Sequence, residues 1–196
     1  MKSEKLRDLL LNQGFAAAEI ISLESSPAGR ELKAQGFSAA AMTALAYPVD
    51  GPADLSTPED PQAVLAPFAR ANYYQEALAR LKRVVRRICE DSGRTKREFR
   101  IFVNSRLPEK PLALEAGLGF QGRNSLIITP SAGSLVVLAG LALPFLPEGA
   151  FEPSAPAFRC GNCRRCVDAC PTGAIRPEGG VDTSLCLQAL ATNPFP

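Results

Sequence analysis

Closely spaced cysteines toward the end of the chain constrain its fold more than any other feature. They stand at Cys160, Cys163, Cys166 and Cys170, and Pro171 follows the last of them. The two-residue gaps let a tightly turning backbone present three soft thiolates to three irons of one iron–sulfur cube, and the three-residue gap commonly sends the fourth thiolate to a different cluster. This run therefore predicts a redox-active iron–sulfur module in which one cube is short of a ligand.

Two other interpretations of the cysteines compete with a cluster. A zinc knuckle usually uses two C-x2-C pairs that lie well apart, and a disulfide framework is typical of small secreted chains. The first residues carry both charge signs and lack an uncharged apolar core. We therefore expect neither export nor membrane insertion, and a reducing cytoplasm suits free thiolates. Cys89 borders the apolar stripe of an expected helix, which indicates a buried structural thiol.

The rest of the chain has the pattern of a mixed α/β domain. Its 196 residues are 46% hydrophobic, enough for one core and a small appendage. Apolar spacing and Gly/Pro positions predict the helices and strands. We expect helices at 2–12, at 62–91 with a break near Ala71-Asn72, and at 111–116; strands at 15–23, 42–49, 98–103, 126–129 and 134–143; a turn at 130–133; and irregular connections at 50–61 and 144–156.

Basic residues gather on the polar face of the long helix and in the loop after it. The net charge is only +2, so any attraction to nucleic acid must come from a local patch. This patch is either a solvated helix face or a surface that contacts RNA phosphates. Its members, named here the long-helix basic face, are Lys82, Arg83, Arg86, Arg87, Arg94, Lys96, Arg97 and Arg100.

A glycine-rich loop occupies residues 117–125 (GLGFQGRNS). It does not directly follow an expected strand, so it does not predict a dinucleotide-binding fingerprint. Glycine allows a backbone to approach another group closely. The loop is therefore either a packing element or a place where backbone meets a ligand.

The order of these motifs resembles the epoxyqueuosine reductase family. The likeness is carried by Asn104-Ser105, by 108–113 (PEKPLA), by 117–134 (GLGFQGRNSLIITPSAGS) and by the Cys run. The segments LRDLLLNQGF, ALAYP, FARANYYQEALARL and VDTSLCLQAL also have counterparts in that family. The resemblance implies a nitroreductase-like α/β domain that binds cobalamin, over residues 1–145, and a partial ferredoxin-like 4Fe-4S module over 146–196.

The same resemblance implies an activity, cofactors and partners. Members of the family are similar to cobalamin-dependent reductive dehalogenases, and they reduce epoxyqueuosine to queuosine in tRNA with electrons that pass through two 4Fe-4S clusters to cobalt. We accordingly expect tRNA and an electron donor of the flavodoxin or ferredoxin type as partners, and no membrane. The implied corrinoid contacts come from the glycine loop, the expected 127–138 hairpin and the long helix: Tyr74, Gly119, Gly122, Arg123, Asn124, Ile127, Ser134 and Leu138.

The resemblance also assigns the cluster ligands. Cys160, Cys163 and Cys166 would hold the cluster nearest the corrinoid, and Cys170 and Cys186 would contribute to the second. The family's remaining ligands lie in a second Cys run beyond Pro196. The resemblance thus describes a diverged or C-terminally truncated member, with one or two clusters.

The chain departs from the family where the substrate would be protonated. Asn104 stands where the family has an aspartic acid, and Asn72-Tyr73-Tyr74 replaces Asp-Tyr-His in a sequence without any histidine. An amide cannot deliver a proton as a carboxylic acid can. Two functions therefore remain open: a reductase that uses another acid, such as Tyr73 or Tyr74, and an electron-transfer or corrinoid-handling protein without substrate chemistry. A remnant that binds zinc or no metal is a third interpretation.

Overall fold

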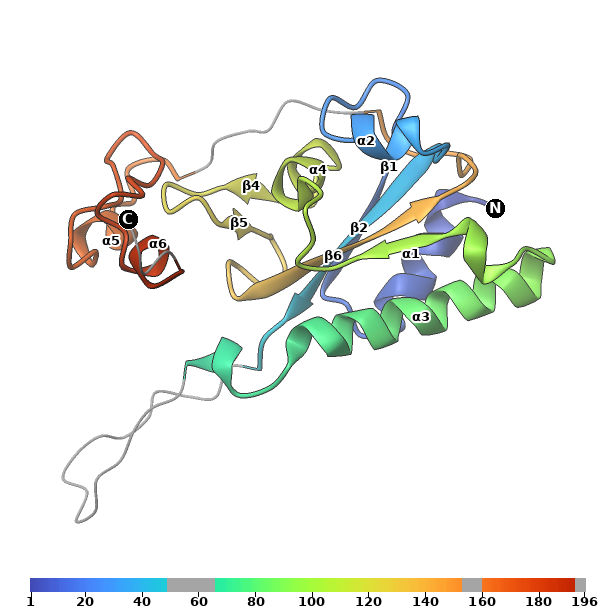
Figure 1. Cartoon of the computed structure of the whole chain (residues 1–196), viewed down its shortest axis with the longest axis horizontal. Coiled ribbons are helices and arrows are strands. Elements are labelled where there is room, and N and C mark those ends of the chain that lie inside the picture. Colours follow the sequence, from blue (N-terminus) through green and yellow to red (C-terminus); the bar gives the residue numbers. More distant parts are fainter. Residues whose placement is uncertain (49–65, 153–159, 193–196) are drawn as a thin grey trace, which may run out of the picture.

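An antiparallel sheet organises the computed structural model, which describes residues 1–48, 66–152 and 160–192. The strands lie in the order β1 (Ala17–Ser22), β2 (Ala39–Ala46), β6 (Val136–Leu143) and β3 (Arg100–Phe102), and every neighbouring pair is antiparallel (Figure 1). The two central strands, β2 and β6, pair along eight residues each. They form the centre of the sheet against which two hydrophobic cores pack, one on each face.

The sequence of β2, AAAMTALA, suits a strand that is covered on both faces. It begins earlier than the expected strand at 42–49, and its first seven residues are buried. Alternate side chains point to opposite faces, so Ala41 and Leu45 enter one hydrophobic core while Met42 and Ala44 enter the other. Thr43 is buried without an unpaired polar group because its hydroxyl donates to a backbone carbonyl of β6 at 3.0 Å. Small side chains at this strand let helices pack closely on both sides.

Two helices cover the first face of the sheet, α1 (Ser3–Leu11) and α3 (Tyr73–Ser92) (Figure 1). Asn72 caps α3, because its side-chain oxygen accepts from the amide of Gln75 at 3.1 Å. Gly93 ends the helix in the left-handed region at φ 69°. The apolar stripes of these helices are buried against the sheet through Leu6, Leu10, Leu81, Val84, Val85 and Ile88.

The second face carries α2 (Arg30–Ala34) and α4 (Glu109–Glu115). Leu32 and Leu112 are fully buried here. Glu115 ties α4 to the loop before α2 by accepting hydrogen bonds from the Ser26 hydroxyl and from the Ala28 amide, the latter at 3.1 Å. The protein therefore has a three-layer α/β/α arrangement around one antiparallel sheet.

Two short strands form a second sheet, β4 (Phe120–Gln121) and β5 (Ile127–Ile128). This β4–β5 hairpin corrects the predicted 127–138 hairpin. The segments on either side of the 130–133 turn are strands, but β5 pairs with β4 and β6 pairs with β2 and β3. Adjacency in sequence suggested direct pairing, whereas burial of β6 on both faces places it in the main sheet.

Residues 147–151 correct a second expectation, because they are more than a Pro-rich linker. The amide of Phe151 donates to the carbonyl of Ile20 at 3.0 Å, and the amide of Ser22 donates to the carbonyl of Phe151 at 2.8 Å. The amide of Ser3 also donates to the carbonyl of Glu148 at 2.8 Å. This segment thus covers the outer edge of β1, which would otherwise expose unpaired backbone groups.

The Cys-rich end of the chain forms a small module with little regular structure. It contains α5 (Arg165–Asp168), α6 (Leu187–Thr192) and a bridge between Ile175 and Val181. Figure 1 shows this module beyond the tip of the β4–β5 hairpin, away from the main sheet. In the described ranges, no helix has the length and apolar character that a membrane crossing requires.

The helices and strands expected from periodicity are largely confirmed. The predicted break in the long helix corresponds to the end of the 3₁₀ turn η1 (Pro67–Ala69) before α3, whereas residues 62–65 and the connection at 50–61 lie outside the described residues. The expected strand at 98–103 is shorter, because Glu98 belongs to the 3₁₀ turn η2 (Lys96–Glu98). There its carboxylate accepts from the Thr95 amide at 2.7 Å. The sequence did not predict the short helix α2.

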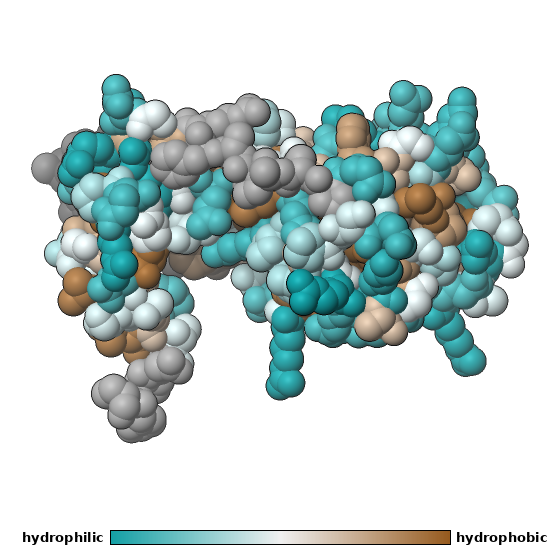
Figure 2. Space-filling view, turned by 90° about the horizontal axis from the view of Figure 1, so that it is seen from above, coloured by the Kyte–Doolittle hydropathy of each residue, from teal (hydrophilic) through white to brown (hydrophobic). Residues whose placement is uncertain are grey.

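The face of the molecule seen in Figure 2 is predominantly hydrophilic. Figure 2 shows brown apolar residues as separate patches among teal ones. Within the Cys-rich module, Leu185, Leu187 and Leu190 each expose close to half of their surface or more. Their neighbour Cys186 is partly buried. Scattered apolar exposure of this kind is normal on a folded domain and does not by itself mark an interface.

Gly140 in β6 provides a test of this packing. A Cβ atom at this position would lie 2.0 Å from the ring of Phe102 on the neighbouring strand. We expect Gly140→Ala to lower the free energy of unfolding by about 1–3 kcal/mol, because overpacking displaces the ring. Denaturant unfolding measures this change. Adding Phe102→Leu should recover part of the loss, and equal stability of Gly140→Ala and the unmodified protein would contradict the packing.

Candidate functional site

A cavity of about 270 Å³ opens where β2 ends and β6 begins. The antiparallel pairing puts these two strand ends side by side, and the amide of Tyr47 donates to the carbonyl of Leu135 at 2.9 Å. Five of the residues assigned to a site by resemblance meet here. The lining comprises Tyr47, Tyr74, Asn104, Glu109, Lys110, Leu126, Ile127, Ser134, Val136, Val137 and Leu138.

Apolar and polar groups share the cavity wall. The branched side chains of Ile127, Val136 and Leu138 contribute apolar surface, and Ser134 adds a hydroxyl. Asn104 reaches the cavity from the loop after β3, where it is exposed and has φ 48°. Asparagine tolerates this left-handed region better than most residues. The local backbone therefore presents an amide, and no acid, at this position.

Three tyrosines gather at one side of the cavity. The rings of Tyr47 and Tyr73 meet edge to face with centroids 4.8 Å apart. Burial, followed by the nearby Tyr74 and Tyr73 hydroxyls, raises the pKa of Tyr47 above its usual value. Tyr47 and Tyr74 line the cavity.

Sequence reasoning missed two charged residues of this cavity. Glu109 and Lys110 begin α4 and looked like ordinary residues of a helix start. The Glu109 carboxylate accepts from the Ser105 amide at 2.8 Å and from its hydroxyl at 2.9 Å, which fixes the loop that carries Asn104. The Lys110 ammonium donates to the carbonyl of Ser125 at 3.0 Å. A signal was present in the sequence, since both residues belong to the PEKPLA segment.

Gly119 and Gly122 lie outside the cavity lining, and the structure explains both by packing. A Cβ on Gly119 would lie 2.4 Å from the carbonyl oxygen of Ile128, and one on Gly122 would lie 2.7 Å from the Ile128 side chain. Asn124 accepts from the amide of Leu126 at 3.2 Å within the hairpin turn. These residues hold the hairpin together, whereas their predicted corrinoid contacts are not among the groups that line the cavity.

Arg123 points to the Cys-rich module. Its guanidinium donates to backbone carbonyls of Gly161, Cys163 and Pro177, with the contact to Gly161 at 2.9 Å. Its own carbonyl accepts from the amide of Gly180 at 3.0 Å. The predicted cofactor-binding arginine therefore contacts the segment that carries the cysteines.

The cysteines of the run lie in tight turns, as their spacing predicted. The amide of Cys163 donates to the carbonyl of Cys160 at 3.0 Å. Hydrogen bonds from the amides of Ile175, Thr172 and Ala174 lower the pKa of Cys170 to about 7. All five cysteines of the predicted set are free thiols, although no three His, Cys, Asp or Glu side chains of the described residues already stand at metal-binding distance.

This donor set is chemically suited to iron–sulfur ligation. Soft thiolates in C-x2-C-x2-C-x3-C-P spacing are the ligands of such clusters, and amide hydrogen bonds to sulfur tune them. Cys89 is different: it is partly buried and packs against the core beneath α3. The fold therefore separates one structural thiol from the group that can bind a cluster.

The long-helix basic face is present, and about half of it has partners within the protein. Arg87 pairs with Asp91 at 3.3 Å, and Arg94 pairs with Glu98 at 2.6 Å. The other two engaged members, Arg83 and Arg100, bond to glutamine side chains of neighbouring segments. Within this described face, the side chains without such a partner are those of Lys82, Arg86, Lys96 and Arg97.

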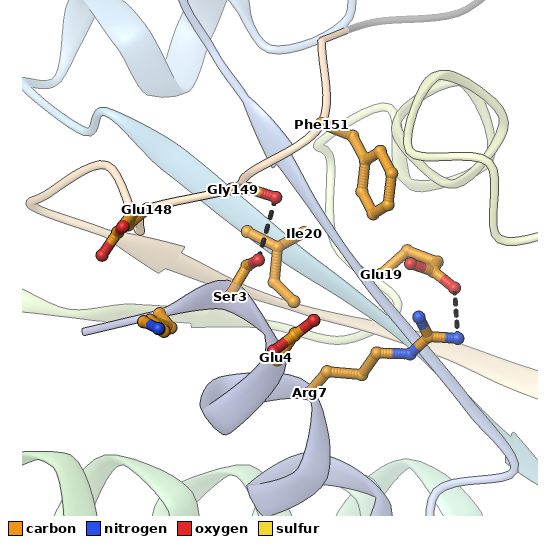
Figure 3. Close-up of a pocket in the computed structure, with 9 residues that line it drawn as sticks. Ser3, Glu4, Arg7, Glu19, Ile20, Glu148, Gly149 and Phe151 are labelled. Carbon is orange, nitrogen blue, oxygen red and sulfur yellow. Dashed lines mark hydrogen bonds and ion pairs between the residues drawn. The ribbon is translucent and has the colours of Figure 1, made fainter.

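A second cavity, of about 340 Å³, lies at the covered edge of β1 and contains none of the predicted site residues (Figure 3). In this cavity Arg7 pairs with Glu19 at 3.0 Å, and the Ser3 hydroxyl donates to the carbonyl of Gly149 at 2.8 Å. Burial raises the pKa of Glu19, and Arg7 offsets part of that rise. These contacts hold α1 against the sheet, and Arg7 and Glu19 neutralise each other within the cavity.

Comparison with known proteins indicates the class of protein to which the chain is similar. Residues 159–194 match the family described as 4Fe-4S double cluster binding domain. The fold and this match confirm the coarse fold class, a mixed α/β protein with a C-terminal 4Fe-4S binding domain.

The particular relatives are epoxyqueuosine reductases. The one from Cyclobacterium marinum is 40% identical over 112 residues, which cover 57% of this chain and 35% of the relative. The one from Vibrio cholerae serotype O1 is 37% identical over 139 residues, covering 70% of this chain and 36% of the relative. The chain is therefore related to the epoxyqueuosine reductases, although the matched part spans only about a third of their length.

Solved structures of such reductases share the fold. The structure from Streptococcus thermophilus has a TM-score of 0.77 and 22% identity, covering 96% of this chain and 57% of that chain. A reductase solved with an epoxyqueuosine-modified tRNA-Tyr stem loop has a TM-score of 0.66 and 22% identity, covering 95% of this chain and 56% of that chain. At this level of identity, the likeness establishes the fold.

The close contact at Gly119 can be tested directly. We expect Gly119→Ala to open the β4–β5 hairpin, because the added methyl meets a backbone carbonyl that cannot rotate away. Amide exchange at Gly122, whose N–H donates to the carbonyl of Leu126, should then accelerate. Gly36→Ala adds the same methyl in open space, where the φ of 88° strains any side chain, and it therefore serves as a control for a loss of stability away from the hairpin. Unchanged exchange in Gly119→Ala would show that the hairpin does not depend on this approach.

Proposed function

We propose that the chain is an iron–sulfur oxidoreductase of the epoxyqueuosine reductase type, which reduces epoxyqueuosine to queuosine in tRNA. One observation carries the proposal: a single hairpin connects a Cys module suited to a cluster with a cavity lined by five of the family-assigned residues. In this proposal residues 1–145 are a nitroreductase-like, cobalamin-binding domain and residues 146–196 are a ferredoxin-like module. The relatives named as such reductases support it.

The electron path begins at the Cys module. Cys160, Cys163 and Cys166 would hold one cluster, and Cys170 and Cys186 would supply ligands to a second. A flavodoxin or ferredoxin type of donor would reduce them. The low pKa of Cys170 supports a thiolate that is ready to bind iron.

Replacing one ligand should remove the cluster. We expect Cys163→Ser to lose most of its iron and sulfide, because thiolate is the normal ligand of 4Fe-4S clusters. Iron and sulfide analysis of anaerobically purified protein measures this, along with the broad absorption near ~400 nm that bleaches on reduction. Cys89→Ser should keep its iron, since that thiol packs against the core. Full iron content in Cys163→Ser would exclude the assignment, and a colourless zinc protein would support the zinc interpretation.

The cavity has features that suit one face of a planar corrinoid. Ile127, Val136 and Leu138 offer apolar contact to a ring system, and Asn104 and Lys110 can bond to polar groups at its edge. At about 270 Å³ the cavity is smaller than typical pockets for whole ligands of ~300–1,000 Å³, so it would contact only part of so large a molecule. When bound, cobalamin would supply the metal centre that passes electrons from the cluster to the substrate.

The reduced substrate would then also need a proton. Asn104 cannot do so, because an amide does not ionise in the required range. The hydroxyls of Tyr47 and Tyr74 and the carboxyl of Glu109 share the cavity with it. A proton can therefore come from one of these groups or from water, and the rate of this step should be low compared with that of an aspartic acid.

Restoring the acid tests this step. We expect Asn104→Asp to raise turnover of epoxyqueuosine in tRNA, by a factor up to the ~10²–10⁴ that general acids supply. Chemically reduced cobalamin is added so that electron supply does not limit the rate. Asn12→Asp adds the same charge at the exposed end of α1 and should leave turnover unchanged.

The outcomes separate the two functions left open by the sequence. Activity in neither protein would favour an electron-transfer or corrinoid-handling role without substrate chemistry. Equal activity in the unmodified protein and in the Asn104→Asp variant would show that another group donates the proton. Tyr74→Phe and Glu109→Gln would then identify that group.

A tRNA substrate also needs a binding surface. The side chains of Lys82, Arg86, Lys96 and Arg97 lie exposed on the long-helix basic face and can contact phosphates. Such contacts position the RNA and make binding salt-dependent without reading its sequence. The stem loop bound by one structural relative supports RNA as the partner class.

A further inference from the structure

We propose that Arg123 is a positioning residue that latches the cluster-binding loop onto the β4–β5 hairpin and raises the reduction potential of the cluster held there. The inference rests on the proposed function in one respect, namely that the Cys run holds a cluster. Nothing in the family resemblance assigns this role, which follows from contacts in the structure.

The latch includes four hydrogen bonds made by Arg123. The guanidinium donates to the carbonyls of Gly161, Cys163 and Pro177, and the Arg123 carbonyl accepts from the Gly180 amide at 3.0 Å. Two separate turns of the module are thereby held by a single side chain and its backbone. A planar guanidinium with five donors suits this arrangement, whereas an ammonium cannot reach several carbonyls in one plane.

The hairpin that carries Arg123 is itself fixed to the cavity. Two hydrogen bonds of 2.9 Å close its turn. The amide of Gly122 donates to the carbonyl of Leu126, and the amide of Ser125 donates to the carbonyl of Gly122. Lys110 of the cavity donates to Ser125 at 3.0 Å. The residues immediately after the turn, 126–127, line the cavity. A continuous set of short contacts therefore links the cavity wall to the loop of Cys163.

The charge of Arg123 has a separate consequence. Its guanidinium donates hydrogen bonds to the carbonyls of Gly161 and Cys163, which belong to the loop that would surround the first cluster. Reduction adds a negative charge to a cluster, and a nearby cation stabilises that charge. The cluster potential should therefore be higher with Arg123 than with a neutral residue. Arg123 would thus have two effects, on the position of the loop and on the reduction potential of the cluster, and different substitutions can separate them.

Two variants and one control test the latch in the full chain with its clusters intact. Arg123→Gln removes the charge and the fork of donors, and Arg123→Lys keeps the charge and removes the fork. The control, Arg30→Gln, removes an exposed arginine at the start of α2. The measurements are iron content, the midpoint potential from a redox titration followed by electron paramagnetic resonance, and amide hydrogen exchange at Gly180 and across 160–182.

We expect exchange at Gly180 to accelerate by at least about tenfold in both Arg123 variants, because charge-assisted hydrogen bonds that hold the module are lost. The potential should fall in Arg123→Gln and fall less in Arg123→Lys. Arg30→Gln should match the unmodified protein in every measurement. A fall in potential at constant iron content is the signature that a purely structural role of Arg123 does not produce.

The opposite results overturn the inference. Unchanged exchange at Gly180 in both variants would show that Arg123 does not hold the module. An unchanged potential in Arg123→Gln would show that its charge does not act on the cluster. Absence of iron from the unmodified protein would overturn the proposed function instead, and the exchange comparison would still decide whether the latch exists.

Discussion

The pairing of β2 with β6 is the interaction on which the rest of the structure depends. These strands are buried on both faces, so two helical layers must cover them, and burial of apolar surface is the main force that holds such layers together. Because the strands run antiparallel, the end of β2 lies beside the start of β6. Tyr47 thereby meets Ser134, Val136 and Leu138 at one edge of the sheet. The cavity is a direct result of this register.

The β4–β5 hairpin connects that edge to the Cys-rich module. Its glycines are required where strands and turn approach closely, and the same short segment carries Leu126 and Ile127 toward the cavity and Arg123 toward the cysteines. In the proposed function this short element would hold the redox centre at a constant distance from the substrate site, because catalytic geometry tolerates little misplacement. Gly119 and Gly122 therefore allow the hairpin between the cavity and the Cys-rich module to pack closely, and neither glycine lines the cavity.

Asn104 gives the cavity a different chemical character from that of an acid-containing site. The loop that carries it is well defined, since Glu109 holds Ser105 through two hydrogen bonds and the asparagine adopts φ 48°. The geometry needed to present a side chain is therefore retained although the side chain cannot release a proton. Tyr47, Tyr74 and Glu109 line the same cavity, and in the proposed function these groups are the candidates for proton transfer by another route.

The sequence by itself determined the local features of this protein. The Cys spacing indicated an iron–sulfur module, the apolar stripe of the long helix indicated α3, and the MTALAYPV run indicated a buried strand, because each depends on neighbouring residues alone. Tertiary structure decided which distant segments meet. The structure pairs β5 with β4 instead of with β6. It also brings together residues that are far apart in sequence: residues 147–151 cover β1, Glu109 and Lys110 line the cavity, and Arg123 contacts Gly161. Such contacts arise from the packing of whole layers and loops, for which short-range periodicity carries no information.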